Sequence, residues 1–132
     1  MHRCIYFVAL VTVLATSVAQ AAASPQETVY RSYEVAMSKG DIDAMEATMT
    51  KARAAELQAQ RDSPQFQMMF GFIRGNALHD TKVEKVDTHG NDATLSVSGK
   101  DSAGNPSTSS VHMLKEGGHW RIEKESTSTH AH

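Results

Sequence analysis

The sequence predicts an α+β domain in which N-terminal helices pack on an antiparallel sheet of about four strands. Apolar residues recur at helical spacing as far as Gly75, and from Lys82 onward they alternate with polar residues, which is the period of a strand. Turn-forming residues divide the second half into short segments that are expected to pair as successive hairpins. One face of such a sheet is apolar, and the helices are the elements available to cover it.

Residues 1–21 have the pattern of a cleaved signal peptide. Arg3 supplies the positive charge, residues 5–15 form an apolar run, and the segment ends in an A-x-A cleavage pattern. The run is shorter than the roughly 20 residues that a membrane-spanning helix needs. Cleavage is expected after Ala21, or alternatively after Ala23. We therefore expect a periplasmic or secreted protein without a membrane anchor.

The only cysteine, Cys4, precedes the apolar run, whereas a lipoprotein signal would place a cysteine at the cleavage point. The mature chain is therefore predicted to have neither a lipid anchor nor a disulfide, so its stability must come from a packed core. We expect one α+β domain over residues 24–125 and a flexible polar tail over residues 126–132. The chain carries 13 Lys and Arg against 15 Asp and Glu without a basic stripe, which argues against nucleic-acid binding.

Capping residues delimit the first helices. Ser24 can cap a helix that has Pro25 in its first turn, and Gly40 suits the left-handed position after its last residue. Asp41 can cap a second helix immediately afterwards. The apolar residues at helical spacing are Val29, Tyr33, Ala36 and Met37, then Ile42, Met45 and Met49. Residues 51–61 are rich in helix formers, and they either continue the second helix or form a separate, loosely packed one.

Ser63 and Pro64 mark the start of another helix, which carries the clearest apolar face in the chain. That face consists of Phe66, Met69, Phe70 and Ile73. Because a helix with a strong apolar stripe buries it against a neighbour, we expect this face to lie across the sheet.

The strands are predicted from alternation and from the turns between them. Residues 82–87 form the first strand, in which Val83 and Val86 are out of phase and indicate a bulge. The inward-facing residues of the later strands are expected to be Ala93, Leu95 and Val97, then Val111 and Met113, then Trp120 and Ile122. The hydroxyl-rich residues 107–110 are expected to form a solvated edge.

Two segments of this pattern resemble a known superfamily. Residues 36–41 have the form A-x-x-x-G-D, and residues 114–122 form a hairpin close to L-x-K-E-x-G-x-W-x-I, although Gly117-Gly118-His119 alters its turn. Both are similar to segments of the nuclear transport factor 2-like (NTF2-like) superfamily, and most closely to small exported bacterial lumazine-binding-like proteins of uncharacterised function. Residues 91–97 fit the same pattern. The resemblance implies a cystatin-like, cone-shaped fold whose curved sheet and helices enclose a pocket.

The implied pocket would be lined by apolar and aromatic residues of the helices and the sheet. The candidates are Tyr30, Tyr33, Phe66, Phe70, Ile73, Leu95, Val97, Met113 and Trp120. Some relatives use such a pocket for enolisation or dehydration, with a carboxylate base and tyrosine or acid donors. Asp41 is better explained as a helix cap, and no spacing brings His112 or His119 next to a tyrosine. No catalytic residue is therefore predicted.

Metal and cofactor sites are not predicted either. Residues 130–132 form an H-x-H tail that could hold a metal loosely, and methionines are soft ligands that would suit copper. Met45, Met49 and Met69 lie on apolar helix faces, however, so core packing explains them better. The sequence contains no phosphate-binding loop and no zinc-spaced cluster of cysteine and histidine, and no cofactor is expected.

Three functions follow as alternatives. The first is an exported, non-catalytic binding domain that holds a small apolar ligand or a protein partner. The second is a periplasmic immunity or inhibitor protein that neutralises a toxic effector, which suits a small, exported, acidic domain. The third is an isomerase or dehydratase, which would need a buried carboxylate facing a tyrosine inside the cone. The resemblance also implies that two copies can pair through their sheets as a homodimer.

Overall fold

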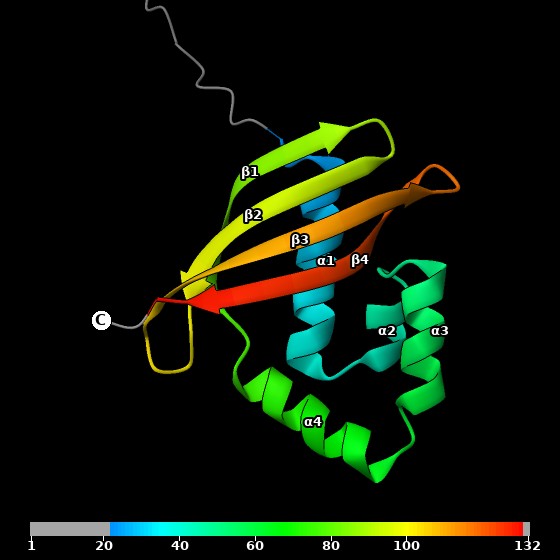
Figure 1. Ribbon diagram of the computed structural model, residues 1–132, viewed down its shortest axis with the longest axis vertical. Helices are drawn as coiled ribbons and strands as arrows, with labels where there is room; N and C mark the ends of the chain where they lie inside the picture. Colours follow the sequence, from blue (N-terminus) through cyan, green and yellow to red (C-terminus); the bar gives the residue numbers. More distant parts are fainter. Residues whose placement is uncertain (1–21, 131–132) are drawn as a thin grey trace, which may run out of the picture.

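The computed structural model describes residues 22–130, which form four helices and one four-stranded sheet (Figure 1). The helices are α1 (Pro25–Lys39), α2 (Ile42–Glu46), α3 (Lys51–Gln60) and α4 (Pro64–Gly75). The strands, all antiparallel and in the order β1-β2-β3-β4, are β1 (His79–His89), β2 (Asp92–Lys100), β3 (Pro106–Glu116) and β4 (His119–Thr129). The predicted α+β class and sheet are confirmed. The predicted signal peptide, residues 1–21, lies outside the described residues.

The core lies between α1 and one face of the curved sheet. α1 crosses the strands on that face and contacts β1, β2 and β4 (Figure 1). From α1 the core receives Tyr30, Tyr33 and Ala36. From the sheet it receives Ala93, Leu95, Val97, Val111, Met113 and Ile122, each at most 2 % exposed. Burial of this apolar surface is the main force that holds the helix on the sheet.

The apolar face of α4 does not lie across the sheet, so that expectation from the sequence is wrong. Figure 1 shows α4 away from the sheet face, which α1 already covers. Phe66 and Phe70 are buried with their ring centroids 5.5 Å apart, but Met69 and Ile73 are 48 % and 43 % exposed. Met69 is therefore not a core residue. No helix within residues 22–130 has both the length and the apolar character needed to cross a bilayer.

The helix caps expected from the sequence are present. Ser24, Asp41 and Ser63 each accept a hydrogen bond of 3.1 Å from the backbone N–H three residues later. α1 ends at Gly40, whose φ of 67° is left-handed. The next residue, Asp41, donates its N–H to the carbonyl of Ala36 at 2.9 Å. These bonds satisfy helix-end groups that would otherwise lack partners, and they fix the sharp turn from α1 into α2.

Gly40→Ala is expected to lower the free energy of unfolding by about 1–2 kcal/mol, because an L residue is strained at this positive φ. An added Cβ would also lie 2.9 Å from Nη1 of Arg74. Chemical denaturation measures the change. Gly71→Ala is the control, because Gly71 lies inside α4 with no atom within 4 Å of an added Cβ. That variant is expected to be as stable as the wild type or slightly more stable. Equal stability of the two variants would contradict the role of Gly40.

α2 and α3 are separate helices because the residues between them pair with β4. Ile122 donates its N–H to the carbonyl of Thr48 at 2.8 Å, and Thr50 donates its N–H to the carbonyl of Ile122 at 3.0 Å. Thr50 then caps α3 by accepting the N–H of Arg53 at 3.3 Å. A continuous helix could not make this bridge, which decides between the two alternatives left by the sequence. It also fixes the start of α3, and therefore Arg53, next to the sheet.

β4 continues to Thr129, so residues 126–129 are not part of a flexible tail. They pair with residues 107–110 of β3. Ser107 and Ser109 are 2 % and 4 % exposed, so the predicted solvated edge is also wrong. Hydroxyl groups tolerate this burial because they find partners, as Ser107 Oγ does 3.0 Å from Oγ1 of Thr129. The inner face of the sheet is therefore apolar in one half and hydroxyl-rich in the other.

Candidate functional site

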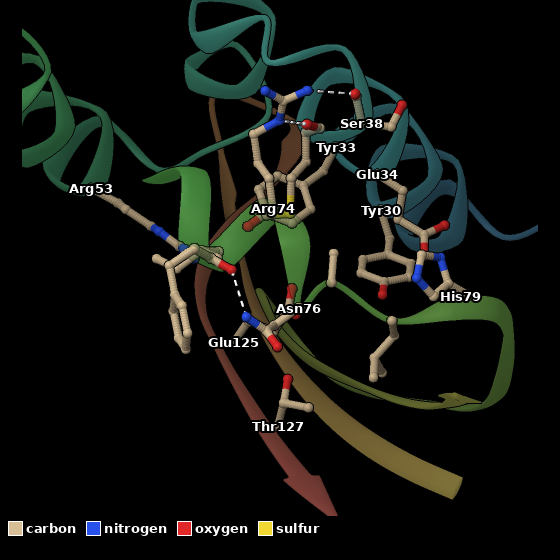
Figure 2. A pocket seen from close by; sticks show the side chains of 15 residues that line it. Tyr30, Tyr33, Glu34, Ser38, Arg53, Arg74, Asn76, His79, Glu125 and Thr127 are labelled. Carbon is tan, nitrogen blue, oxygen red and sulfur yellow. Dashed lines mark hydrogen bonds between the residues drawn. The ribbon is translucent and has the colours of Figure 1, made fainter. Parts of the chain in front are cut away.

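A cavity of about 610 Å³ lies between α1, α3, α4 and the C-terminal part of β4. Figure 2 shows Tyr30, Glu34 and His79 on one side of it and Arg53 on the opposite side. Its wall consists of Tyr30, Tyr33, Glu34, Met37, Ser38, Arg53, Phe72, Ile73, Arg74, Asn76, Ala77, Leu78, His79, Glu125 and Thr127. The wall therefore combines apolar side chains with both acidic and basic ones.

A bulge in β4 determines which of its side chains reach the cavity. The pairing of β3 with β4 shifts by one residue at Glu123, which is an extra residue in β4. Before the bulge, Ile122 points into the core. After it the phase is reversed, so that Glu125 lies opposite the buried Val111 and lines the cavity together with Thr127. The bulge thus turns a carboxylate toward the helices from a strand position that would otherwise face solvent.

The tyrosines of α1 supply hydroxyl groups to the cavity wall. The ring centroids of Tyr30 and Tyr33 are 6.4 Å apart, and both side chains are buried. Burial raises the pKa of each tyrosine far above its ordinary value, and the negative charge of Glu125 raises both further. The two hydroxyls therefore stay protonated at any physiological pH and can act as hydrogen-bond donors.

Glu34 is held at the rim of the same wall by neighbours from α1 and β1. Thr81 donates its hydroxyl to Glu34 at 2.5 Å, and Arg31 donates from Nη1 at 2.7 Å. Arg31 also donates to the backbone carbonyl of Thr81 at 3.1 Å. This network fastens β1 to α1 and compensates most of the charge of Glu34. Because it is partly exposed, its contribution to stability is modest.

Arg53 and Glu125 are half-buried and approach the cavity from α3 and β4. Within residues 22–130, the buried atoms Nη1 of Arg53 and Oε2 of Glu125 have no hydrogen-bond partner. Burial raises the pKa of Glu125 above its ordinary value, and the negative charge of Glu34 raises it as well. The positive charge of Arg53 and the Ser109 hydroxyl lower this pKa in part. The desolvation of Glu125 outweighs its attraction to Arg53, so the ionised form of Glu125 is less stable here than in water.

The raised pKa of Glu125 makes the stability of the protein depend on pH. The folded state binds this proton more readily than the unfolded chain, so stability falls as pH rises from the ordinary value of 4.5 through the higher folded pKa. Glu125→Gln removes this dependence. Urea unfolding of the wild type and of Glu125→Gln measures this from about pH 4 to about pH 8. The free energy of unfolding of Glu125→Gln, relative to the wild type, is expected to rise with pH and then to level off. A difference that is constant with pH would contradict the desolvation of Glu125.

The last turn of α4 is fastened to the end of α1 by Arg74. Its Nε donates to the carbonyl of Met37 at 2.9 Å, and its Nη2 donates to the carbonyl of Ser38 at 2.8 Å. The guanidinium also lies 5.8 Å from the ring centroid of Phe70. A cation at these carbonyls is favourable because they carry the partial negative charge of the helix end. The contact places Phe72 and Ile73 in the cavity wall.

Comparison with known proteins places this geometry in a recognised fold. No protein-family model matches the chain, and no curated protein matches its sequence. An NTF2-like protein of unknown function from Shewanella baltica is 17% identical, with a TM-score of 0.54, over 82% of this chain and 93% of that one. A second, from Silicibacter pomeroyi, is 20% identical, with a TM-score of 0.53, over 79% of this chain and 92% of that one. The chain has an NTF2-like fold.

A further NTF2-like protein of unknown function, from Methylobacillus flagellatus, is 15% identical, with a TM-score of 0.53, over 81% of this chain and 90% of that one. These likenesses extend over most of each chain, and they agree with the fold that the resemblance of residues 36–41 and 114–122 implies. At such identities they establish the fold alone. The finer resemblance to lumazine-binding-like proteins stays a prediction.

The NTF2-like cone distributes the predicted pocket residues between two regions. Tyr30, Tyr33 and Ile73 lie in the cavity wall. The others, which are Phe66, Phe70, Leu95, Val97, Met113 and Trp120, belong to the hydrophobic core and not to this wall. Leu95, Val97 and Met113 lie on the sheet face that α1 covers, while Phe66 and Phe70 stack on each other in α4. The cavity lies instead beside the hydroxyl-rich half of the sheet.

The sequence did not reveal the charged residues of the cavity. Trp120 and Ile122 alternate with Arg121 and Glu123, and continuing that alternation would turn Glu125 to the outside. Only the bulge at Glu123 reverses it. The sequence does not indicate that Arg53 lines a cavity, because Arg53 lies in a helix with a thin apolar face. One signal could have indicated that Glu125 faces inward. It is the alternation of the partner strand, in which Ser107 and Ser109 are inward-facing.

The outer face of the NTF2-like sheet is polar. It carries Thr94, Ser96, Ser110 and His112. The imidazole of His112 lies between two carboxylates: it is 2.5 Å from Oδ1 of Asp92 and contacts Oε2 of Glu123. Within residues 22–130 no cluster of histidine and acidic residues could hold a metal ion. His132 lies outside the described residues, so the H-x-H tail is not described as a unit.

Proposed function

We propose that this protein binds a small molecule in the cavity, with an apolar body against α4 and a polar group against β4. The observation that carries the proposal is the composition of the wall. Phe72, Ile73 and Met37 form an apolar side, and the charged residues Arg53 and Glu125 line the same space. A volume of about 610 Å³ lies within the range of small-molecule sites, and such sites combine apolar walls with a few converging polar groups.

The proposal places this binding domain in the periplasm or outside the cell. The basis is the signal-peptide pattern of residues 1–21. N-terminal sequencing of the protein purified from its native compartment tests this part. An N-terminus at Ala22 or Ser24 supports export, and an intact Met1 contradicts it.

Titration with ethylbenzene, an apolar probe, tests binding in the cavity. Two-dimensional NMR is expected to show shifted amide signals for Tyr30, Ile73 and Glu125. Ile73→Trp fills the cavity from its wall and is expected to weaken binding about tenfold or more. The control is Met68→Trp in the same helix, because Met68 is 77 % exposed and does not line the cavity. Amide shifts confined to Met68 and Met69, which lie outside the cavity wall, or equal effects of the two variants, would contradict the proposal.

A second function, proton transfer on a bound carbonyl compound, is favoured by the pKa of Glu125. Burial raises this pKa, which makes the side chain a better base once it is ionised. The carboxylate would take a proton from the carbon next to the carbonyl, and the electron pair left behind would form an enolate. Tyr30 and Tyr33, which stay protonated, would donate hydrogen bonds to the enolate oxygen.

Deuterium exchange of cyclohexanone tests this second function. If Glu125 acts as a base, the protein accelerates exchange of the α-protons in D₂O, and Glu125→Gln abolishes the acceleration. The carboxyl proton on Glu125 exchanges with D₂O before a deuteron returns from Glu125 to carbon, so the solvent is the only other reactant. Equal exchange rates with wild type, with Glu125→Gln and without protein would exclude proton transfer and leave ligand binding intact.

Binding of a protein partner, including an immunity or inhibitor role, would use the exposed apolar face of α4. This face comprises Met68, Met69, Phe72 and Ile73. If one effector co-purifies from the native periplasm with the wild type and is lost with Met68→Lys, that role is favoured over ligand binding. Light scattering in the same preparation tests the homodimer expected from the resemblance, and a monomer mass would exclude it.

A further inference from the structure

The strongest unexplained feature of the molecule is a pair of buried polar atoms in the cavity wall. Within residues 22–130, Nη1 of Arg53 and Oε2 of Glu125 have no hydrogen-bond partner. Buried polar atoms in folded proteins are nearly always paired, because an unpaired one loses its hydration without compensation. Both residues line one cavity, although the two atoms themselves have almost no solvent-accessible surface. A single bound molecule can supply both missing partners once the guanidinium and the carboxyl group turn toward the cavity.

We propose that Arg53 and Glu125 together bind a neutral head group that carries an N–H donor next to a carbonyl acceptor, as in a primary carboxamide or a lactam. This assignment rests on the proposed function, since it identifies the polar group of the ligand that the cavity binds. The guanidinium of Arg53 can only donate, and an ionised Glu125 can only accept. The complementary head group must therefore accept from the first and donate to the second.

The charges around the cavity favour a neutral head group over a charged one. A carboxylate head group would gain from Arg53 but would meet the negative charge of Glu125. An ammonium head group would gain from Glu125 but would meet the positive charge of Arg53. Arg74, the other guanidinium in the wall, is directed toward the end of α1, because its Nε and Nη2 donate to the backbone carbonyls of Met37 and Ser38. A neutral dipole satisfies both open atoms without adding an unbalanced charge to a partly desolvated site.

The protonation of Glu125 does not change this preference. Its raised pKa means that the carboxyl group is protonated over a wider pH range than usual. A protonated carboxyl group pairs with an amide through one donor and one acceptor on each side, whereas a carboxylate accepts from the amide N–H. An amide edge is therefore complementary to Glu125 in both states, whereas a ketone, which only accepts, is complementary to the protonated state alone.

Four probes with one aromatic body test the head-group assignment. Phenylacetamide carries the proposed amide, phenylacetate a negative charge, phenethylamine a positive charge, and ethylbenzene no polar group. Dissociation constants from NMR titration are expected to be about tenfold or more lower for phenylacetamide than for each of the others. Equal affinity of ethylbenzene and phenylacetamide would overturn the assignment while leaving cavity binding intact. No binding of any probe would overturn both.

Variants at the two residues show whether they create the preference. Arg53→Met and Glu125→Met are each expected to bring phenylacetamide to within about twofold of ethylbenzene. The matched controls are Arg61→Met and Glu56→Met, which lie outside the cavity wall and are expected to keep the wild-type ratio. If a methionine variant fails to fold by circular dichroism, leucine replaces methionine at that position, because leucine also carries no polar side-chain atom. A wild-type ratio in the folded variants of Arg53 and Glu125 would overturn the assignment.

Discussion

Replacing Ile122 by alanine is expected to lower the free energy of unfolding by about 2–5 kcal/mol. Ile122 is 0 % exposed and lies in the core between the sheet and α1. Truncation loses the transfer free energy of the removed carbons and leaves a cavity that close-packed neighbours fill only in part. The backbone of Ile122 also holds Thr48 and Thr50 through two hydrogen bonds, so a shift of β4 would loosen the start of α3.

Urea denaturation of Ile122→Ala measures this loss, and Ile73→Ala is the matched control. Ile73 carries the same side chain but is 43 % exposed on α4, so its truncation is expected to lower the free energy of unfolding by less than about 1 kcal/mol. Similar losses in the two variants would mean that the core does not lie between α1 and the sheet.

Replacing both Arg53 and Glu125 by methionine is expected to raise the free energy of unfolding by about 1–2 kcal/mol. The double variant removes the two buried atoms that have no partner within residues 22–130 and substitutes unbranched apolar side chains that adapt to the space. Each single replacement is expected to lower stability by about 1–3 kcal/mol instead, because it leaves one buried charge without its counter-charge.

A double-mutant cycle by thermal or urea unfolding measures these changes at one pH near neutrality. The same double variant is expected to lose the preference for phenylacetamide over ethylbenzene. This combination of higher stability and lost selectivity is the signature of a site that is kept for binding at the expense of the fold. A double variant less stable than both single variants would show that each residue stabilises the protein independently of the other, and it would contradict the expected gain.

The architecture could be predicted from the sequence because its signals are local. Ser24, Asp41 and Ser63 are capping residues, Gly40 marks the end of a helix, and the turns separate four strands. Even the irregularity of β1 near Val83 could be predicted from apolar residues that are out of phase, and the register of β1 with β2 shifts there. Each of these features depends on residues close together in the chain.

The position of α4 could not be predicted, because both α1 and α4 have an apolar face that could pack on the one sheet face. The apolar stripe of α4 is the stronger in sequence, yet α1 covers the sheet and leaves Met68 and Phe72 exposed at 77 % and 71 %. An amphipathic pattern indicates that one face of a helix packs against other residues, but it does not indicate which element supplies them. Tertiary competition of this kind is a property of the whole fold.

The cavity could be predicted only in part. Tyr33 follows from the helical spacing of α1, and Tyr30 is a candidate only through the pocket that the resemblance implies. Glu125 faces the cavity because of one extra residue, Glu123, in β4. A bulge changes which face every later side chain occupies, so an error of one residue reverses the assignment of a strand. Arg53 enters the wall because a backbone bridge to Ile122 starts α3 at that point, and such a bridge has no signal in the sequence.

Intermolecular nuclear Overhauser effects between phenylacetamide and the protein test the occupation of the cavity most directly. The protons of the probe ring are expected to show effects to the side chains of Ile73 and Met37, and its amide protons to the side chain of Glu125. That pattern places the apolar body against α4 and α1 and the head group at β4. Effects confined to Met68 on the outer face of α4, or none at all with the probe in excess, would contradict ligand binding in the cavity.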